Sequence, residues 1–570
     1  MKRTRIIILG IISILLIPFI SGAQDQFTDF LRTELRAQMD ELKKQEFPPY
    51  YMNYRVVDEQ FARVITSFGV LTAKESNRER TLVPQIRIGN PEFDNFKIKQ
   101  MGSPISRFHG PSYAVLPIDD TNGDNATRQA IWNEVNNRYK FAIDAYQTAR
   151  AETTINVAEE DKAPCFSQAP AEKYYEAPLP ANRTAVDLDA WEKRLKEISA
   201  VFKKHPKILR GDASFRYTVK RIYVLDSEGT EVVQNLTYAR IMVQGAAKAD
   251  DGMELPLVLS YFAHSPESLP SNEQILKDAN LMADKLIALR DAPIVDPYTG
   301  PAILSGSASG VFFHEIFGHR VEGQRMKSES DGQTFKKMVG EYVLPADMHV
   351  YDDPTIREYA GEDLNGFYKY DDQGVKAERV DVVVNGKLNE FLMTRTPIDG
   401  QPRSNGHARA MGGFDPVSRQ SNLVIETSNP KTPEELRQLL IEEVKKQGKE
   451  YGYFFKEVTS GFTFTGKGGT NSFNVTPLEV YKVFADGRPD QLVRGVDLIG
   501  TPLSMFSNII YAGNDARVFT GMCGAESGSI PVTAISPTIL VNKVETQRKA
   551  KSQDILPILS APGLEKKAKN

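Results

Sequence analysis

The chain has 570 residues, 41% of them hydrophobic, so it can bury substantial cores, and its length predicts two or more domains. The formal net charge is -4 at pH 7, close to balance. The sequence has no block of like charge and no basic stripe with interleaved aromatic residues, which argues against nucleic acid as a direct partner.

The N-terminus has the pattern of a secretory signal. Lys2, Arg3 and Arg5 precede an apolar run over residues 6–20, and small residues follow at 21–23. An uncleaved membrane anchor is the alternative, but the run is short for a bilayer span and contains a proline. We therefore expect residues 1–23 to be a cleaved signal peptide. The mature protein should be extracytoplasmic, either periplasmic or secreted, with no membrane segment.

Residues 24–292 are predicted to form an N-terminal α+β domain. Periodic apolar residues indicate helices, and runs rich in branched and aromatic residues indicate strands. The predicted helices cover residues 27–42, 127–150, 188–202 and 273–289. The predicted strands cover residues 52–59, 62–75, 80–89, 215–226, 231–247 and 254–264. Residues 153–184, rich in proline and alanine, are predicted to be a loop or wrapping segment.

A turn-rich break at residues 291–303 is the best domain boundary, and a β-rich domain over 293–545 is expected after it. Asn385-Gly386 between two apolar runs predicts a type I′ hairpin. Thr432-Pro433-Glu434-Glu435 predicts the capped start of a helix. Residues 546–570 form a polar C-terminal tail. The predicted fold is α+β, with a mixed N-terminal domain followed by a β-rich domain that carries a kinked histidine helix.

That helix contains the motif His314-Glu315-x-x-x-His319. Zinc peptidase helices usually space two histidines by four residues, which places both on one face. A spacing of five puts them roughly 140° apart on a regular helix, so a shared metal requires the helix to end, kink or loosen between them. Gly318 permits such a departure. The alternative is a straight helix that aligns Glu315 with His319, with His314 as a core residue.

A peptidase zinc needs a third protein ligand and an open position for water. Cys523 is the preferred candidate, because its glycine-bracketed turn GMCGAESG lets a thiolate approach a metal. The alternative is that Cys523 is simply a small buried residue in a strand turn. Glu322 is a rival ligand, or it orients the His319 imidazole from behind. Glu315 is the natural general base. The other five histidines lack a partnered spacing and are predicted to be structural or exposed, and Cys165 has no assigned role.

The motif does not stand alone. VFFHEIFGHRVEG is followed by VDVVVNGKLNEFLM, NGHARAMGGFDPVSRQSN, a TSG segment, GVDLIGTPLSMFSNI and GMCGAESGSIPVTAISPTILV. In order and spacing these blocks, over residues 296–545, resemble the TldD/PmbA family, the modulator-of-gyrase zinc metallopeptidases. The match before residue 290 is looser, with an apparent insertion at about 100–185. Gln324 and the AESGSIPV turn depart from the usual family pattern, and known members are mostly cytoplasmic.

The resemblance implies one Zn²⁺ per chain, bound by His314, His319 and Cys523, with Glu315 as the catalytic carboxylate of an active, TldD-like subunit. It also implies a homodimer, or a heterodimer with a family paralogue, that encloses a chamber admitting unfolded or short peptides by strand addition. From its size and position alone, we expect the N-terminal domain to build the dimer and the chamber wall.

We therefore expect an exported zinc metallopeptidase. The alternative is a non-catalytic metal-binding partner subunit of a peptidase complex. A binding protein without a metal would require the motifs to be coincidental. Retention of Glu315 favours the enzyme, because a purely structural zinc needs no base.

Overall fold

The computed structural model describes residues 25–97, 113–120, 123–155, 162–327, 331–463, 465–466, 473–549 and 559. The predicted signal peptide, most of the C-terminal tail and parts of the predicted insertion lie outside these ranges. Within them, no helix is both long and apolar enough to cross a membrane.

The N-terminal part is built on one sheet of long strands in the order β3-β2-β1-β5-β6-β4, with β7 also paired to β6. All of these pairings are antiparallel except β4 with β6. The strands are β1 (Pro49–Ser67), β2 (Val70–Ile88), β3 (Ala114–Leu116), β4 (Lys173–Tyr175), β5 (Ile208–Asp226), β6 (Glu231–Lys248) and β7 (Glu254–Ala263).

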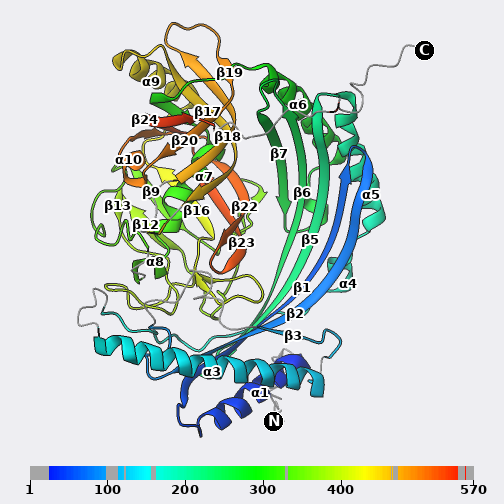
Figure 1. The fold of residues 1–570 in the computed structure, drawn as a ribbon, viewed down its shortest axis with the longest axis vertical. Coiled ribbons are helices and arrows are strands. Elements are labelled where there is room, and N and C mark those ends of the chain that lie inside the picture. The colour runs from blue at the N-terminus through cyan, green and yellow to red at the C-terminus, as the bar shows by residue number, and fades with distance from the viewer. Residues whose placement is uncertain are drawn as a thin grey trace, which may run out of the picture.

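Helices cover this sheet at two places (Figure 1). One buried cluster joins α1 and α3 to β1 and β2, and a second joins α5 and α6 to β5, β6 and β7. The helical segments are α1 (Gln26–Leu42), α3 (Asn125–Ile155), α4 (Ala181–Thr184), α5 (Leu188–Ala200) and α6 (Asn272–Asp291), with 3-10 turns η1 (Val201–Lys204) and η2 (Pro266–Ser268). Asp187 and Ser271 cap α5 and α6 through their side chains, as their sequence positions predicted.

Two predictions for this part need correction. The three strands expected between residues 52 and 89 are two strands of a single hairpin. Phe68 and Gly69 both have positive φ and turn the chain in the middle of the predicted strand 62–75. The predicted loop 153–184 is also more ordered than expected, since α3 continues to Ile155 and the short elements β4 and α4 follow.

The C-terminal part contains two sheets, and α7 (Gly306–Ile316) makes contact with strands of both (Figure 1). The first has the order β13-β12-β9-β16-β23-β22. Its strands are β9 (Met348–Asp352), β12 (Val380–Val384), β13 (Lys387–Leu388), β16 (Asn422–Thr427), β22 (Arg517–Ala525) and β23 (Gly528–Ser536).

The second sheet has the order β17-β8-β24-β20-β18-β19, with β21 paired to β24. Its strands are β8 (Tyr298–Leu304), β17 (Tyr451–Thr463), β18 (Phe473–Phe484), β19 (Gln491–Val493), β20 (Val496–Gly500), β21 (Ile509–Ala512) and β24 (Ile539–Arg548). The remaining elements are η3 (Gly318–Arg320), α8 (Gln324–Lys327), α9 (Pro433–Lys446), α10 (Pro502–Phe506) and two small ladders, β10 (Glu358–Tyr359) with β11 (Glu362–Asp363) and β14 (Ala408–Arg409) with β15 (Val417–Ser418).

The fold is α+β, as predicted. The turn residues Asn385 and Gly386 have φ of 49° and 75°, the positive values that a type I′ turn requires. Thr432 and Glu435 form the expected capping box of α9. The predicted end of the second domain at residue 545 is too early, because β24 pairs with β20 as far as Arg548.

Candidate metal centre

The histidine helix is buried on all sides and ends between its two histidines. Ser305 caps the start of α7, and the helix stops at Ile316. Every residue of α7 after Ser307 is buried. A 3-10 turn, η3, then carries His319. Its different pitch brings the two imidazole rings to 5.0 Å between centroids, with planes 73° apart. The five-residue spacing is therefore compatible with one shared site.

Gly318 acts differently from the sequence-based expectation. Its φ lies outside the positive region, so the backbone freedom of glycine is not what the position uses. A Cβ atom at this position would lie 1.8 Å from Oε1 of Gln420. The Gln420 amide occupies that space and donates a 3.3 Å hydrogen bond to the His314 carbonyl. Close packing, rather than backbone conformation, calls for a glycine.

Cys523 comes from β22, about two hundred residues further along the chain. Its Sγ atom lies 3.3 Å from Nε2 of His319. Ligand atoms of His314, His319 and Cys523 all lie within 4.8 Å of one another, and all three side chains are buried. Two imidazoles and one thiolate form a donor set that zinc takes in catalytic sites, with a fourth position left for water or substrate. The cluster therefore fits a zinc ion.

The charges around the cluster favour the metal-binding form of the cysteine. Burial alone would raise the pKa of the Cys523 thiol, but the positive His319, Arg419 and His314 outweigh it, so the pKa falls well below its usual value. Arg419 also donates from Nη2 to the Cys523 sulfur at 3.1 Å and to its carbonyl at 2.8 Å. A thiolate held in this way is ready to bind a metal without a large desolvation cost.

Glu322 lies on the other side of the His319 ring from Cys523. Its carboxylate contacts Nδ1 of His319 at 3.2 Å, whereas Cys523 faces Nε2. Arg325 and Arg419 approach the same carboxylate at 2.8 and 3.5 Å. Burial raises the pKa of Glu322, but the charges of His319 and Arg325 bring it down to about 2. Of its two predicted roles, the geometry supports orientation of the imidazole rather than direct ligation.

Glu315 is next to His314 and borders the same cavity. Among the described residues its carboxylate has no hydrogen bond or ion pair. Gly461 of β17 passes so close that a Cβ there would lie 2.2 Å from Cγ of Glu315. The strand thus holds the carboxylate in place without neutralising it, which suits a general base.

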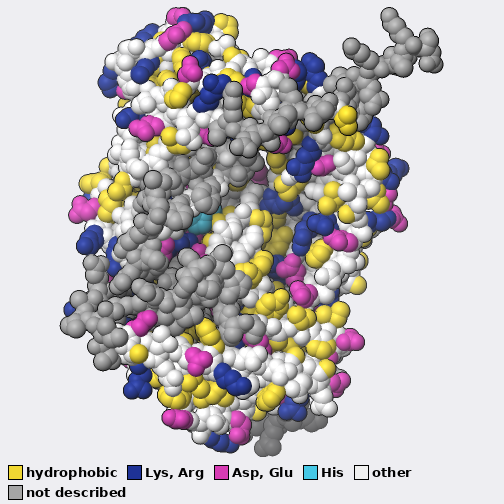
Figure 2. Space-filling view, in the orientation of Figure 1, with side chains coloured by type: hydrophobic (Ala, Val, Ile, Leu, Met, Phe, Trp, Pro, Cys, Tyr) yellow, Lys and Arg dark blue, Asp and Glu magenta, His cyan; other side chains and the backbone are white. Residues whose placement is uncertain are grey.

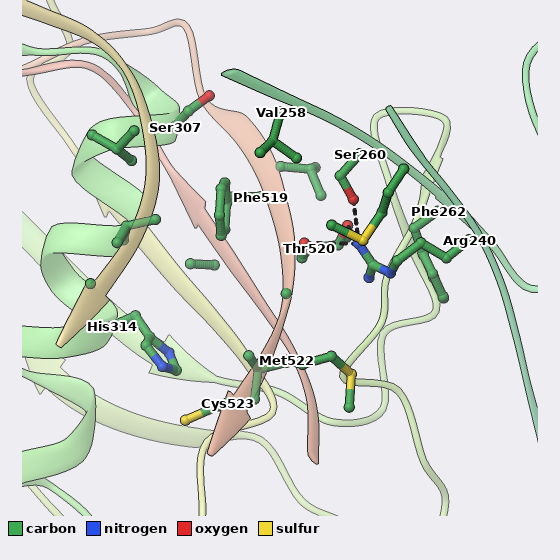
Figure 3. A pocket seen from close by; sticks show the side chains of 18 of the residues that line it. Arg240, Val258, Ser260, Phe262, Ser307, His314, Phe519, Thr520, Met522 and Cys523 are labelled. Carbon is green, nitrogen blue, oxygen red and sulfur yellow. Dashed lines mark hydrogen bonds between the residues drawn. The ribbon is translucent and has the colours of Figure 1, made fainter. Parts of the chain in front are cut away.

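The cluster lies on a cavity of about 2020 Å³ between the C-terminal part and the N-terminal sheet. Figure 2 shows the hollow between the two parts, with a histidine visible in it. Strands β6 and β7 line one side, and β22 and α7 line the other. Figure 3 shows His314 and Cys523 pointing toward each other on one side of this cavity.

Sequence reasoning did not assign roles to several residues that build the site. Arg419 and Gln420 belong to the block NGHARAMGGFDPVSRQSN, and Gly461 belongs to the TSG segment, so the resemblance pointed to the segments but not to the contacts. Arg325 joins Glu322 to Glu526, with 3.1 Å to the latter. The sequence signal for this ion pair was the position of Arg325, three residues after Glu322.

Of the remaining sequence candidates, His407 and His264 are buried and hydrogen-bonded within the protein, as predicted for structural histidines. Cys165 is a buried free thiol whose Sγ donates weakly to the Glu92 carbonyl.

Comparison with known proteins relates the part of the chain that carries the buried His-His-Cys cluster to metallopeptidases. Residues 297–548 match the family described as the PmbA/TldA metallopeptidase C-terminal domain. A metalloprotease from Archaeoglobus fulgidus is 29% identical over 238 residues, 42% of this chain and 51% of that protein. A zinc metalloprotease TldD homologue from Saccharolobus solfataricus is 25% identical over 43% of this chain and 51% of that protein.

The match thus spans about half the length of these relatives. Over the whole fold, the crystal structure of TldE from Thermococcus kodakarensis has a TM-score of 0.59 at 14% identity and covers 92% of this chain and all of that one. Residues 297–548 thus match the TldD/PmbA family, and the likeness to TldE shows that the chain shares its overall fold.

Proposed function

We propose that this protein is a zinc-dependent metallopeptidase that hydrolyses unfolded or short peptides. The observation that carries the proposal is the convergence of His314, His319 and Cys523 within 4.8 Å on the wall of a large cavity, with Glu315 beside them. One zinc ion per chain, when bound, would polarise the scissile carbonyl and lower the pKa of a water molecule. Glu315 would take the proton from that water and pass it to the leaving amine.

The cavity walls suit an extended peptide. Strand β22, which carries Cys523, lies at the end of its sheet and, in the part of the chain described, pairs only with β23. On the opposite wall, strand β7 of the N-terminal sheet pairs only with β6 among the described residues, so its other edge is available. An extended chain can pair with such an edge through its backbone, independently of side chains. A folded protein cannot offer its backbone in this way, which favours unfolded substrates.

A non-catalytic partner subunit is the second candidate, since the TldE structure has the same fold. Glu315 argues against it here. A purely structural zinc would favour four protein ligands and would need no free carboxylate beside them. We propose that the chain is the active subunit of a homodimer, or of a heterodimer with a paralogue.

We also propose that the protein works outside the cytoplasm. The support is the basic, apolar and small-residue order of residues 1–23. N-terminal sequencing of the protein from fractionated cells tests this, and a cytoplasmic protein that keeps Met1 would contradict it.

Two substitutions test the enzyme proposal. Cys523→Ala should lose the zinc that the wild type binds at one equivalent per chain, whereas Cys165→Ala, which removes the other buried thiol, should keep it. Glu315→Gln should keep zinc and lose about 100- to 10,000-fold in peptide hydrolysis. Metal content and digestion of an unstructured peptide mixture are the two measurements. An active Glu315→Gln enzyme, or zinc retained in Cys523→Ala, would refute the assignments.

A further inference from the structure

Arg240 lies in the same cavity, on the wall opposite the cluster. It comes from β6, whose residues alternate: Ala239, Ile241 and Val243 are buried in the core beneath the sheet, while Arg240 and its alternate neighbours line the cavity. Figure 3 shows Arg240 reaching from its strand toward Thr520 of β22. The side chain thus bridges the two walls.

The guanidinium group is held but not neutralised. Its Nη1 donates to Ser260 Oγ at 2.5 Å and to the Thr520 carbonyl at 3.2 Å. The Phe262 ring lies 5.4 Å from its centre. Nη2 is buried and has no hydrogen-bond partner in the part of the chain that the structure describes. Among the described residues no carboxylate pairs with it.

The other two basic side chains of the cavity are paired. Lys285 contacts Glu479 at 2.8 Å, and Arg325 contacts Glu322 at 2.8 Å. A desolvated cation without a counter-charge is costly, and here burial lowers the pKa of Arg240 to about 10. Arginine presents a planar fork that matches a carboxylate. Among the Lys and Arg side chains described in the cavity lining, Arg240 is therefore the one without a carboxylate partner.

The position of Arg240 sets the distance between a bound carboxylate and the metal cluster. Arg240 contacts Thr520, and Cys523 is three residues further along the same strand. At the rise of a β-strand this is about 10 Å, which an extended peptide also spans with about three residues.

We propose that Arg240 binds a carboxylate of the peptide substrate about three residues from the bond that is cleaved. The proposal rests on the peptidase function proposed above and deepens it. The carboxylate can be the C-terminal one, in which case the enzyme trims short pieces from the end of a chain, or that of an Asp or Glu side chain. Recognition of the terminus would leave the rest of the sequence free, in keeping with backbone pairing along β22.

The test uses zinc-loaded wild type, Arg240→Gln, Arg240→Lys and the control Arg216→Gln. Arg216 is the direct cross-strand neighbour of Arg240 on β5, but it pairs with Glu59 and does not line the cavity. Three peptides of one unstructured sequence are compared. The first has a free C-terminus, the second a C-terminal amide, and the third an amide together with an Asp at the position that the observed cleavage site places three residues away.

For the wild type we expect kcat/KM to be about 10- to 100-fold higher for at least one carboxylate peptide than for the plain amide. The free-acid peptide or the Asp peptide identifies which carboxylate is bound. Arg240→Gln should abolish this preference, Arg240→Lys should restore part of it, and Arg216→Gln should keep it.

Binding of the same peptides, fluorescently labelled, to Glu315→Gln with and without Arg240→Gln gives a readout that does not need turnover. The inference would be overturned, while the peptidase function stands, if the proteins that keep Arg240 treat all three peptides alike: equal cleavage by the wild type and equal binding by Glu315→Gln. An equal loss for all peptides in Arg240→Gln would overturn it too, because it would show a structural role. If the wild type cuts no peptide, the proposed function fails, and the binding measurement still decides whether Arg240 selects a carboxylate.

Discussion

Two buried clusters of the C-terminal part contain a histidine beside a carboxylate, and they differ in what else they contact. In one, His407 lies 3.2 Å from Asp352 and 3.0 Å from the Asn405 carbonyl, and Asp352 also accepts from the backbone and hydroxyl of Ser421. Both His407 and Asp352 are 0% exposed. In the other, His319 borders the cavity, and its described partners are Glu322 on one ring nitrogen and the Cys523 sulfur on the other.

The difference shows what separates a structural histidine from a candidate ligand. Both nitrogens of His407 already have oxygen partners, and the ring is fully buried. His319 has one nitrogen fixed by a carboxylate, while the other faces a thiolate and a second imidazole, an arrangement that a metal ion completes. A carboxylate partner alone therefore does not identify a functional histidine. Several metal-binding atoms that meet at the wall of a cavity do.

The largest expected effect separates the two clusters by stability. Asp352→Ala should lower the free energy of unfolding by about 3–5 kcal/mol, because it leaves Nε2 of His407 and the backbone N–H of Ser421 buried without a partner. The folded fraction should keep its zinc. His319→Ala should lose zinc but cost much less in metal-free protein, since Glu322 keeps Arg325. Denaturant unfolding in the presence of a chelator measures the stability of each variant, and metal analysis measures its zinc content. Equal destabilisation by the two substitutions would contradict the difference between a structural and a metal-binding histidine.

A smaller effect tests the support of the thiolate. Arg419→Lys keeps the charge but loses the planar guanidinium group, whose Nη2 reaches the sulfur and the carbonyl of Cys523 while Nη1 reaches Ser527 and Gly528. We expect zinc affinity to fall about 10- to 100-fold. Arg395→Lys is the matched control, because Arg395 is equally buried but contacts the Ser167 carbonyl away from the cluster. Competition with a chelator of known zinc affinity gives the comparison, and an unchanged affinity would show that Arg419 serves only packing.

The smallest effect concerns the turn between the histidines. Gly318→Ala should destabilise the protein by about 1–3 kcal/mol through its contact with Gln420. Adding Gln420→Ala should recover part of this loss, since it removes the atoms in the way. If glycine were required for its backbone conformation instead, the second substitution would recover nothing. Thermal unfolding of the two single variants and the double variant decides between these explanations.

The sequence by itself determined most of the helices and several local signals. The caps at Asp187, Ser271 and Thr432 and the turn at Asn385-Gly386 depend on interactions within a few residues, so the local sequence is sufficient to encode them. It also identified the three residues that the structure brings together. That inference came partly from spacing and partly from resemblance.

Only the tertiary structure decided the rest. The hairpin turn at Phe68 interrupts a stretch rich in branched and aromatic residues, and pairing of β1 with β5 fixes where it lies. Gln420 beside Gly318, Arg419 on Cys523 and the unpaired Arg240 across the cavity are contacts between segments about 100 to 280 residues apart. No periodicity or motif encodes such distances, because they follow from how two sheets and a helix pack together.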